Sequence, residues 1–554
     1  MIEKFFRQFI RFGYLVGFAA LLVSLAHTKY VMSVSQFILA GAFAMERFDL
    51  FKLKRFYEKQ SPIRFYLLLL PYLLYLLFDS IVNGFREFFR NKPAMIFSSI
   101  FLLHILGLLV TSDFGYALKD LRTKLPLFLL PLFLSTSESF GRKNFYWLLI
   151  LFSASVFLRT LINSWNLLEG NYVDIRDISK HISHIILGLL ISLSVFYLGY
   201  LAFLKREFPV WMRILFSLTA IWMLVYLVLS KSATGLAVTA ITFFLLLVIL
   251  IFRARFAWIK TGLTIILVAA AALITIYLVS VYRDYYKVNP VEMTRLDKYT
   301  SRGNPYTNLV GSNMTENGNY IYLYLQFDEM RDAWNKRSKI PFDSLNRRNQ
   351  PIVFTILRFL TSKGYRKDAD GVNRLTDQEI TAIEKGIPNV IFMKGLSIRG
   401  RIYEILWGYE QYKQTGNPTG LTMMQRLEFW KASAGIIKDN WLTGVGTGDM
   451  NTAFQNQYRK MNSKLAPDQR WRSHNQFLSI TVGFGIFGLL WFLFALIYPP
   501  AKLGKFTDYF FLVFFIIAVL SMLPEDTIES QAGVTFFALF YSFLLFARKE
   551  DQPI

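Results

Sequence analysis

Residues 182–204 read ISHIILGLLISLSVFYLGYLAFL, a stretch without a single acidic residue, lysine or arginine. A helix needs about 20 such residues to cross the hydrocarbon core of a bilayer. Similar apolar runs recur on both sides of this one. Lipid admits only helices and closed barrels, because backbone polar groups must be satisfied internally. We therefore expect an all-α polytopic membrane protein.

The apolar runs predict about twelve transmembrane helices. They lie near 12–27, 31–46, 64–84, 93–112, 144–163, 182–204, 213–230, 235–252, 261–282, 475–497, 508–524 and 533–547. A further run, 125–134, has about half the length that a span requires. It contains Pro126 and Pro131, and we interpret it as an interfacial or re-entrant segment.

Composition excludes several other classes of protein. Hydrophobic residues make up 54% of the 554 residues and charged residues only 18%, against about 25% charged in soluble domains. The chain contains no cysteine, which excludes a disulfide scaffold, a cysteine nucleophile and cysteine-ligated metals. On a membrane chain, the net charge of +23 indicates basic residues that set the membrane topology and bind anionic lipid. A nucleic acid is a less favoured partner.

The positive-inside rule orients the predicted helices. With both termini in the cytoplasm, the basic clusters at 47–64 and 119–143 also face the cytoplasm, and only the cluster at 86–92 lies on the wrong side. The chain then divides into an N-terminal membrane bundle (1–282), a large, mainly helical periplasmic module (283–474) and a C-terminal bundle of three spans (475–554).

One polar stretch stands where the module meets the next predicted span. It brings a histidine and two arginines to the lipid–water boundary, in the order Arg470-Trp-Arg472-Ser-His474-Asn475-Gln476. Each residue alone has an ordinary explanation. An arginine at the membrane boundary extends its side chain to the lipid headgroups, and a histidine there packs at the interface. Together with the large outer module, they favour a site for an anionic, lipid-linked substrate.

The C-terminal part of the chain resembles a known family. The residues that carry the resemblance are Arg426, Trp430, Gly444-Val-Gly446-Thr-Gly448, His474-Asn475-Gln476-Phe477-Leu478, Gly485 and Gly488, with Leu523-Pro-Glu525-Asp526-Thr-Ile-Glu529-Ser-Gln531-Ala-Gly533 downstream. This pattern, over roughly 421–547, resembles the bacterial O-antigen ligase and O-antigen polymerase superfamily.

The resemblance implies a metal-independent glycosyl transfer on the periplasmic face of the inner membrane. The donor would be a glycan on undecaprenyl pyrophosphate. The acceptor would be a lipid A core sugar for a ligase, or a second lipid-linked glycan for a polymerase. It implies no cofactor, nucleotide or nucleic acid. His474 takes the position of the family's histidine, and Arg426 that of its loop-helix arginine.

The stretch Ser230-Lys231-Ser232-Ala233 departs from the family's pattern. Family members often carry a Ser-Arg pair here, but the arginine position is Ala233, so Lys231 is the nearest cation. A lysine is a point charge without the bidentate fork of arginine.

The residues also suggest a mechanism of their own. A departing pyrophosphate needs charge stabilisation, and guanidinium groups provide it without a metal. Arg426 and Arg472 are the candidates, with Lys231 and Asn475 as further substrate-binding residues. His474 is the candidate general base for the acceptor hydroxyl.

An O-antigen ligase is the first choice and a surface-polysaccharide polymerase the second. A lipid-linked glycan transporter or a non-catalytic assembly protein is the third, and it would depend on Asp79 or Arg159, the main charges within predicted spans.

Overall fold

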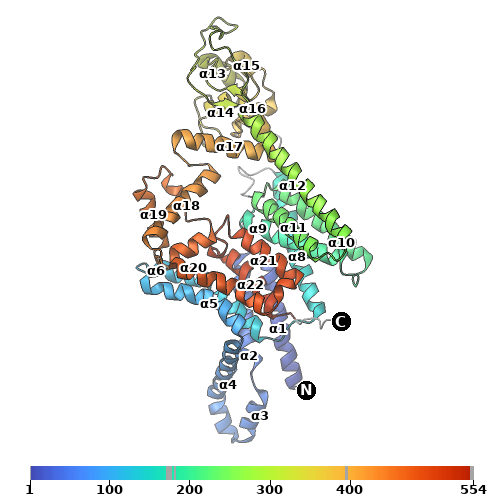
Figure 1. Cartoon of the computed structure of the whole chain (residues 1–554). Helices are drawn as coiled ribbons and strands as arrows, with labels where there is room; N and C mark the ends of the chain where they lie inside the picture. Colours follow the sequence, from blue (N-terminus) through green and yellow to red (C-terminus); the bar gives the residue numbers. More distant parts are fainter. Residues whose placement is uncertain (1, 170–177, 180–181, 394–396, 549–554) are drawn as a thin grey trace. The chain divides into compact units, whose positions relative to one another are not determined.

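The computed structural model describes residues 2–169, 178–179, 182–393 and 397–548 (Figure 1). Its contacts divide the chain into two compact units. The first unit contains the described residues of 1–170, 178–246 and 418–554, and the second those of 247–417. The predicted module 283–474 is therefore shared between the two units, because residues 418–474 pack with the first.

The first unit is built from helices. They are α1 (Ile2–Ser24), α2 (Lys29–Glu46), α3 (Leu50–Glu58), α4 (Pro62–Arg90), α5 (Lys92–Leu106), η1 (Gly107–Val110), α6 (Phe114–Lys124), α7 (Pro126–Thr136), α8 (Arg142–Glu169), α9 (His184–Phe203), α10 (Val210–Leu229), most of α11 (Ala233–Arg253), α18 (Thr422–Asp439), α19 (Met450–Lys460), η4 (Pro467–Gln469), α20 (Gln476–Lys502), η5 (Lys505–Thr507), α21 (Tyr509–Ser521), η6 (Thr527–Glu529) and α22 (Gln531–Phe546).

The second unit combines one long apolar helix with a small polar fold. Its elements are α12 (Ala257–Tyr286), β1 (Thr315–Glu316), β2 (Asn319–Tyr320), α13 (Phe327–Arg337), α14 (Ile352–Ser362), α15 (Ala369–Asn373), α16 (Asp377–Glu384), η3 (Val390–Met393) and α17 (Ile398–Thr415). The two strands pair antiparallel, with Thr315 opposite Tyr320.

Nine helices in the described part of the chain are long and apolar enough to cross a membrane. Each corresponds to one of the twelve predicted spans. The other three predictions fall on α2, which has 18 residues, and on the shorter apolar helices α21 and α22. The all-α polytopic class is therefore confirmed, and the count of twelve stays a prediction.

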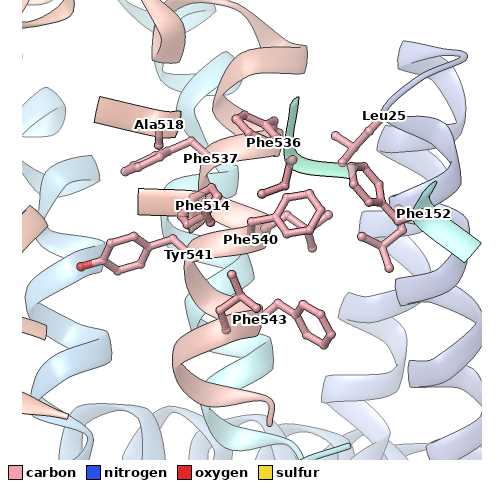
Figure 2. Close-up of a cluster of buried hydrophobic side chains, with 14 of the residues drawn as sticks. Leu25, Phe152, Phe514, Ala518, Phe536, Phe537, Phe540, Tyr541 and Phe543 are labelled. Atoms are coloured by element: carbon pink, nitrogen blue, oxygen red, sulfur yellow. The ribbon is translucent and has the colours of Figure 1, made fainter. Parts of the chain in front are cut away.

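The core of the first unit surrounds α22, whose residues are buried along almost its whole length. Aromatic side chains fill much of this core (Figure 2). Phe540 lies 4.8 Å from Phe152 of α8, and Tyr541 stacks at 3.8 Å on Phe97 of α5. Ring pairs of this kind contribute about 0.5–1.5 kcal/mol each beyond burial. They fix helices that lie far apart in the sequence around one central helix.

Helix α7 runs beside α22 from end to end. Before α7, Lys124 Nζ lies 2.8 Å from Glu529 Oε2, just before α22. After α7, Phe140 N donates to Ala547 O, just after α22, at 2.7 Å. The two helices are therefore parallel. This course differs from the predicted re-entrant path, which would return to the end where it began.

The same contact corrects the predicted sidedness of the 119–124 cluster. The topology placed this cluster opposite His474, but Lys124 pairs with Glu529, which also binds Arg472 and Gln476. The positive-inside rule assumes a solvated charge. Lys124 is instead 1% exposed and is neutralised by Asp120 and Glu529, so its charge is balanced inside the protein.

Candidate active site

His474 lies in a tight turn that leads from η4 into α20. Its φ of 45° is in the left-handed region, which is uncommon for residues other than glycine and carries a cost in strain. Asp526 compensates for this strain: one of its oxygens accepts from His474 N at 3.1 Å and the other from the hydroxyls of Ser473 and Ser479. The loop before α22 therefore fixes the backbone that presents the histidine.

The imidazole of His474 is held by a carboxylate on one side. Nδ1 lies 3.1 Å from Glu525 Oε2. The ring stacks on Phe429 of α18 at 5.4 Å and lies 5.8 Å from Trp471. Since an ionised carboxylate only accepts hydrogen bonds, Nδ1 carries the proton and donates it. Within the described part of the chain, Nε2 makes no hydrogen bond to the protein, and the side chain is 28% exposed.

Nearby charges set the pKa of His474. Burial alone lowers the pKa of this imidazole, but the hydrogen bond to Glu525 and the charges of Glu525 and Asp526 outweigh burial, so the pKa is raised. Arg426 opposes this rise without reversing it. The pKa of the Asp526 carboxyl is itself raised, by burial and by the charge of Glu529. The imidazole at this site therefore holds its proton more strongly than a free histidine does.

Arg426, near the start of α18, joins the same group. Its Nη2 lies 2.8 Å from Glu525 Oε1, so Glu525 bridges the arginine and the histidine through different oxygens. The side chains of Arg426 and Glu525 are 20% and 16% exposed. The structure thus brings together the two residues that the family resemblance predicted as catalytic.

Arg472 lies on the other side of the turn. Its Nε donates to Asn451 Oδ1 at 3.0 Å and its Nη1 to Glu529 Oε2 at 3.1 Å. The guanidinium also lies 5.2 Å from the ring centre of Tyr116 in α6. Burial raises the pKa of Glu529, but Lys124 and Arg472 outweigh burial and hold this pKa well below its usual value. Glu529 is therefore an ionised anchor for Arg472.

The two remaining predicted residues lie differently. Asn475 caps α20: its Oδ1 accepts from Leu478 N at 3.0 Å, and its Nδ2 donates to Leu523 O at 2.9 Å. Both polar atoms of its side chain are thus engaged by backbone. Lys231 is exposed in the turn between α10 and α11, with a φ of 51°. No contact described in the structure joins Lys231 to His474.

A glycine-rich loop docks α18 and α19 onto α20. Val445 N and Gly446 N donate to Val482 O and Gly483 O, both at 2.9 Å. Gly444 has a φ of 71°, and a Cβ there would overlap the backbone of Gly483. The loop is therefore a packing element that positions α18, and with it Arg426, beside His474.

Sequence reasoning assigned no role to several residues that the structure places in this site. They are the carboxylates Glu525, Asp526 and Glu529, together with Lys124, Asp120 and Tyr116. One signal was available, because three carboxylates stand between two apolar helices in Glu525-Asp526-Thr-Ile-Glu529. Acidic groups at a membrane boundary call for cationic partners. Among the described residues, no group of three or more His, Asp or Glu side chains is arranged to hold a metal ion.

The fold and the site together define a class: a polytopic helical membrane protein with a histidine–carboxylate–arginine site beside its closing helices. A family model described as O-antigen ligase matches residues 384–493. The matched segment contains Arg426, Arg472, His474 and Asn475. The match confirms the resemblance to the O-antigen ligase superfamily that the motifs indicated.

Members of this family are glycosyltransferase-like enzymes of O-antigen processing. No curated protein matches the chain. The apolar helices and the family match together indicate a multi-pass bacterial membrane protein.

Proposed function

We propose that this protein is an O-antigen ligase-type glycosyltransferase. It transfers a glycan from undecaprenyl pyrophosphate to a sugar hydroxyl of the lipid A core, on the periplasmic face of the bacterial inner membrane. The observation that carries the proposal is the imidazole of His474, oriented by Glu525 and flanked by Arg426 and Arg472. The resemblance and the match over residues 384–493 support it.

His474 acts on the acceptor hydroxyl in this proposal. The hydroxyl oxygen attacks the anomeric carbon of the donor, and its proton passes to Nε2. A new glycosidic C–O bond forms while the bond from the anomeric carbon to the pyrophosphate oxygen breaks. Glu525 stabilises the resulting imidazolium through Nδ1. General-base assistance of this kind contributes roughly 10²–10⁴-fold in rate.

The arginines act on the leaving group. Undecaprenyl pyrophosphate departs with the bonding electron pair, and its negative charge requires fixed donors. A guanidinium offers five N–H donors. The described contacts of Arg426 and Arg472 use only part of that set, so N–H groups remain for phosphate oxygens. The chemistry therefore proceeds without a metal ion.

A deletion strain tests the proposal, with and without a plasmid copy of the gene. For a ligase, the lipid A core stays bare while long glycan chains accumulate on undecaprenyl pyrophosphate. A core that carries single repeats without a ladder would assign a polymerase instead. Unchanged lipopolysaccharide and lipid-linked glycan profiles would contradict both enzymes and favour a transporter or an assembly protein.

The proposal also includes the orientation of the chain in the membrane. Both termini lie in the cytoplasm, and residues 283–474, between the membrane segments 1–282 and 475–554, lie in the periplasm. Protease accessibility of tags inserted at the exposed residues 302–303 and at the N-terminus checks it in spheroplasts. Cleavage at 302–303 alone is expected, whereas cleavage at the N-terminus alone would invert the orientation.

A further inference from the structure

Arg159 is a buried cation in the first unit. It lies in α8 and is 6% exposed, and its Nε is buried without a hydrogen-bond partner. Among the described residues, no carboxylate pairs with this guanidinium. Charges inside membrane helices normally pair with one another or with backbone carbonyls, because an uncompensated charge is expensive. The guanidinium of Arg159 therefore calls for an anion that the described part of the chain does not provide.

The surroundings of Arg159 are polar. Asn163 follows one helical turn later on the same face of α8, and its Nδ2 donates to Tyr226 Oη of α10 at 3.0 Å. Thr160 Oγ1 accepts from Trp222 Nε1 of α10, also at 3.0 Å. Because Tyr226 Oη accepts a hydrogen bond, its own proton stays available for a ligand. A hydroxyl donor thus lies beside Asn163, one helical turn from Arg159.

The depth of Arg159 follows from how α8 packs on α22. Phe145 lies 5.1 Å from Phe543, and Phe152 lies 4.8 Å from Phe540, so the two helices run antiparallel. Seven further residues advance α8 by about 10 Å. Arg159 then lies near the start of α22 at Gln531, just after Glu529. His474 lies at the same end.

Lys231 extends the same region. The hydrogen bonds Thr160–Trp222 and Asn163–Tyr226 show that α8 and α10 run parallel. Helix α10 ends at Leu229, one turn after Tyr226, and the exposed Lys231 lies in the turn that follows. From Arg159, both helices run toward the end where Lys231 lies. Arg159, Tyr226 and Lys231 thus follow one another along α8 and α10 toward the same end.

We propose that Arg159, Tyr226 and Lys231 bind the phosphate of a membrane lipid. A guanidinium donates well-directed, charge-assisted hydrogen bonds to phosphate oxygens, and a lysine adds charge at longer reach. The lipid is an anionic phospholipid, because the proposed function already assigns the pyrophosphate of the glycan donor to Arg426 and Arg472.

The test measures lipid binding without reaction. The full chain is purified in detergent and supplied with undecaprenyl pyrophosphate or phosphatidylglycerol, and retained lipid is measured by native mass spectrometry. Arg159→Gln is expected to weaken retention by about tenfold or more, as expected for lost charge-assisted bonds. Arg159→Lys should fall between, and Arg253→Gln, at the other end of α11 from Lys231, should match wild type.

The melting temperature distinguishes a ligand-binding role of Arg159 from a purely structural role. Without added lipid, removing an uncompensated buried charge leaves the melting temperature unchanged or raises it, so Arg159→Gln should lose only the stabilisation that lipid adds. A lowered lipid-free melting temperature, or unchanged lipid retention, would overturn the proposal. Preferential retention of undecaprenyl pyrophosphate would also overturn it, because the site would then bind the glycan donor.

A second variant keeps this inference distinct from the proposed function. His474→Asn should retain lipid as wild type does while losing glycan transfer. If His474→Asn transfers normally but Arg159→Gln loses lipid, the phosphate site stands and the proposed mechanism fails. If His474→Asn abolishes transfer and Arg159→Gln keeps lipid, the mechanism stands and the phosphate site fails.

Discussion

Glu525 accepts the Nδ1–H of His474 at 3.1 Å, and its other carboxylate oxygen lies 2.8 Å from Arg426 Nη2. The candidate base and one candidate phosphate-binding cation are thus joined by a single carboxylate. Because that carboxylate is only 16% exposed, the interactions are less screened than surface pairs. Disturbing Glu525 should alter both partners.

Replacing Glu525 by glutamine should reduce glycan transfer by about 10²-fold, within the range of general-base contributions. An amide keeps the shape but loses the charge that stabilises an imidazolium. The measurement is single-turnover transfer of a labelled glycan from its lipid-linked donor. Glu207→Gln, an exposed carboxylate paired with Arg142, is the matched control. Equal rates for the two variants would exclude Glu525 from the mechanism.

The pH dependence of transfer should report His474. A base must be neutral, so activity falls as the pH drops through the pKa of His474, which is raised above its ordinary value of 6.5. Glu525→Gln removes the carboxylate charge that opposes the effect of burial, so the acid limb should move to lower pH. The profile of kcat/KM records the pKa in the free enzyme. An acid limb that stays in place would show that another group titrates.

Lys124→Met should destabilise the protein by about 3–5 kcal/mol, because it leaves the buried carboxylates of Asp120 and Glu529 without their shared cation. The melting temperature in detergent measures the loss. Adding Asp120→Asn should recover part of it, since one uncompensated charge is then removed. If the double variant were less stable than the single one, the buried ion pair would not be the cause.

Gly485→Ala should be strongly destabilising. Gly485 has a φ of 65° inside α20, and a Cβ would overlap the carbonyl of Leu442. Left-handed strain alone costs about 1–3 kcal/mol. The matched control is Gly199→Ala in α9, where a Cβ meets nothing within 4 Å and alanine favours the helix by about 0.5–1 kcal/mol. Similar melting temperatures for the two variants would contradict the packing described for the kink.

Much of the fold could be predicted from apolar run length. The run at 182–204 became α9 (His184–Phe203), because an unbroken apolar stretch has few alternatives to a buried helix. Run length failed for α7, where only 11 residues are helical. Its course depends on packing against α22, and the local sequence does not reveal which helix will pack against it.

The candidate site was predictable in part. The motif residues Arg426 and His474 meet through Glu525, to which sequence reasoning gave no role although it lies in the downstream part of the pattern. The role of Lys124 could not be predicted. A basic residue between two apolar helices is normally interpreted as a solvent-exposed charge that sets the membrane topology. Only the fold shows its partner Glu529, 405 positions away. Pairings between distant segments depend on lateral packing, which hydropathy does not report.

The contacts between α7 and α22 can form only late in the synthesis of the chain. A ribosome adds about 5–20 residues per second, so the 405 positions between Lys124 and Glu529 take roughly 20–80 s to make. During that interval α7 lacks the helix that covers it, and Lys124 lacks one of its two carboxylates. The early helices therefore remain incompletely packed in the membrane until α22, a much later segment of the same chain, has been synthesised.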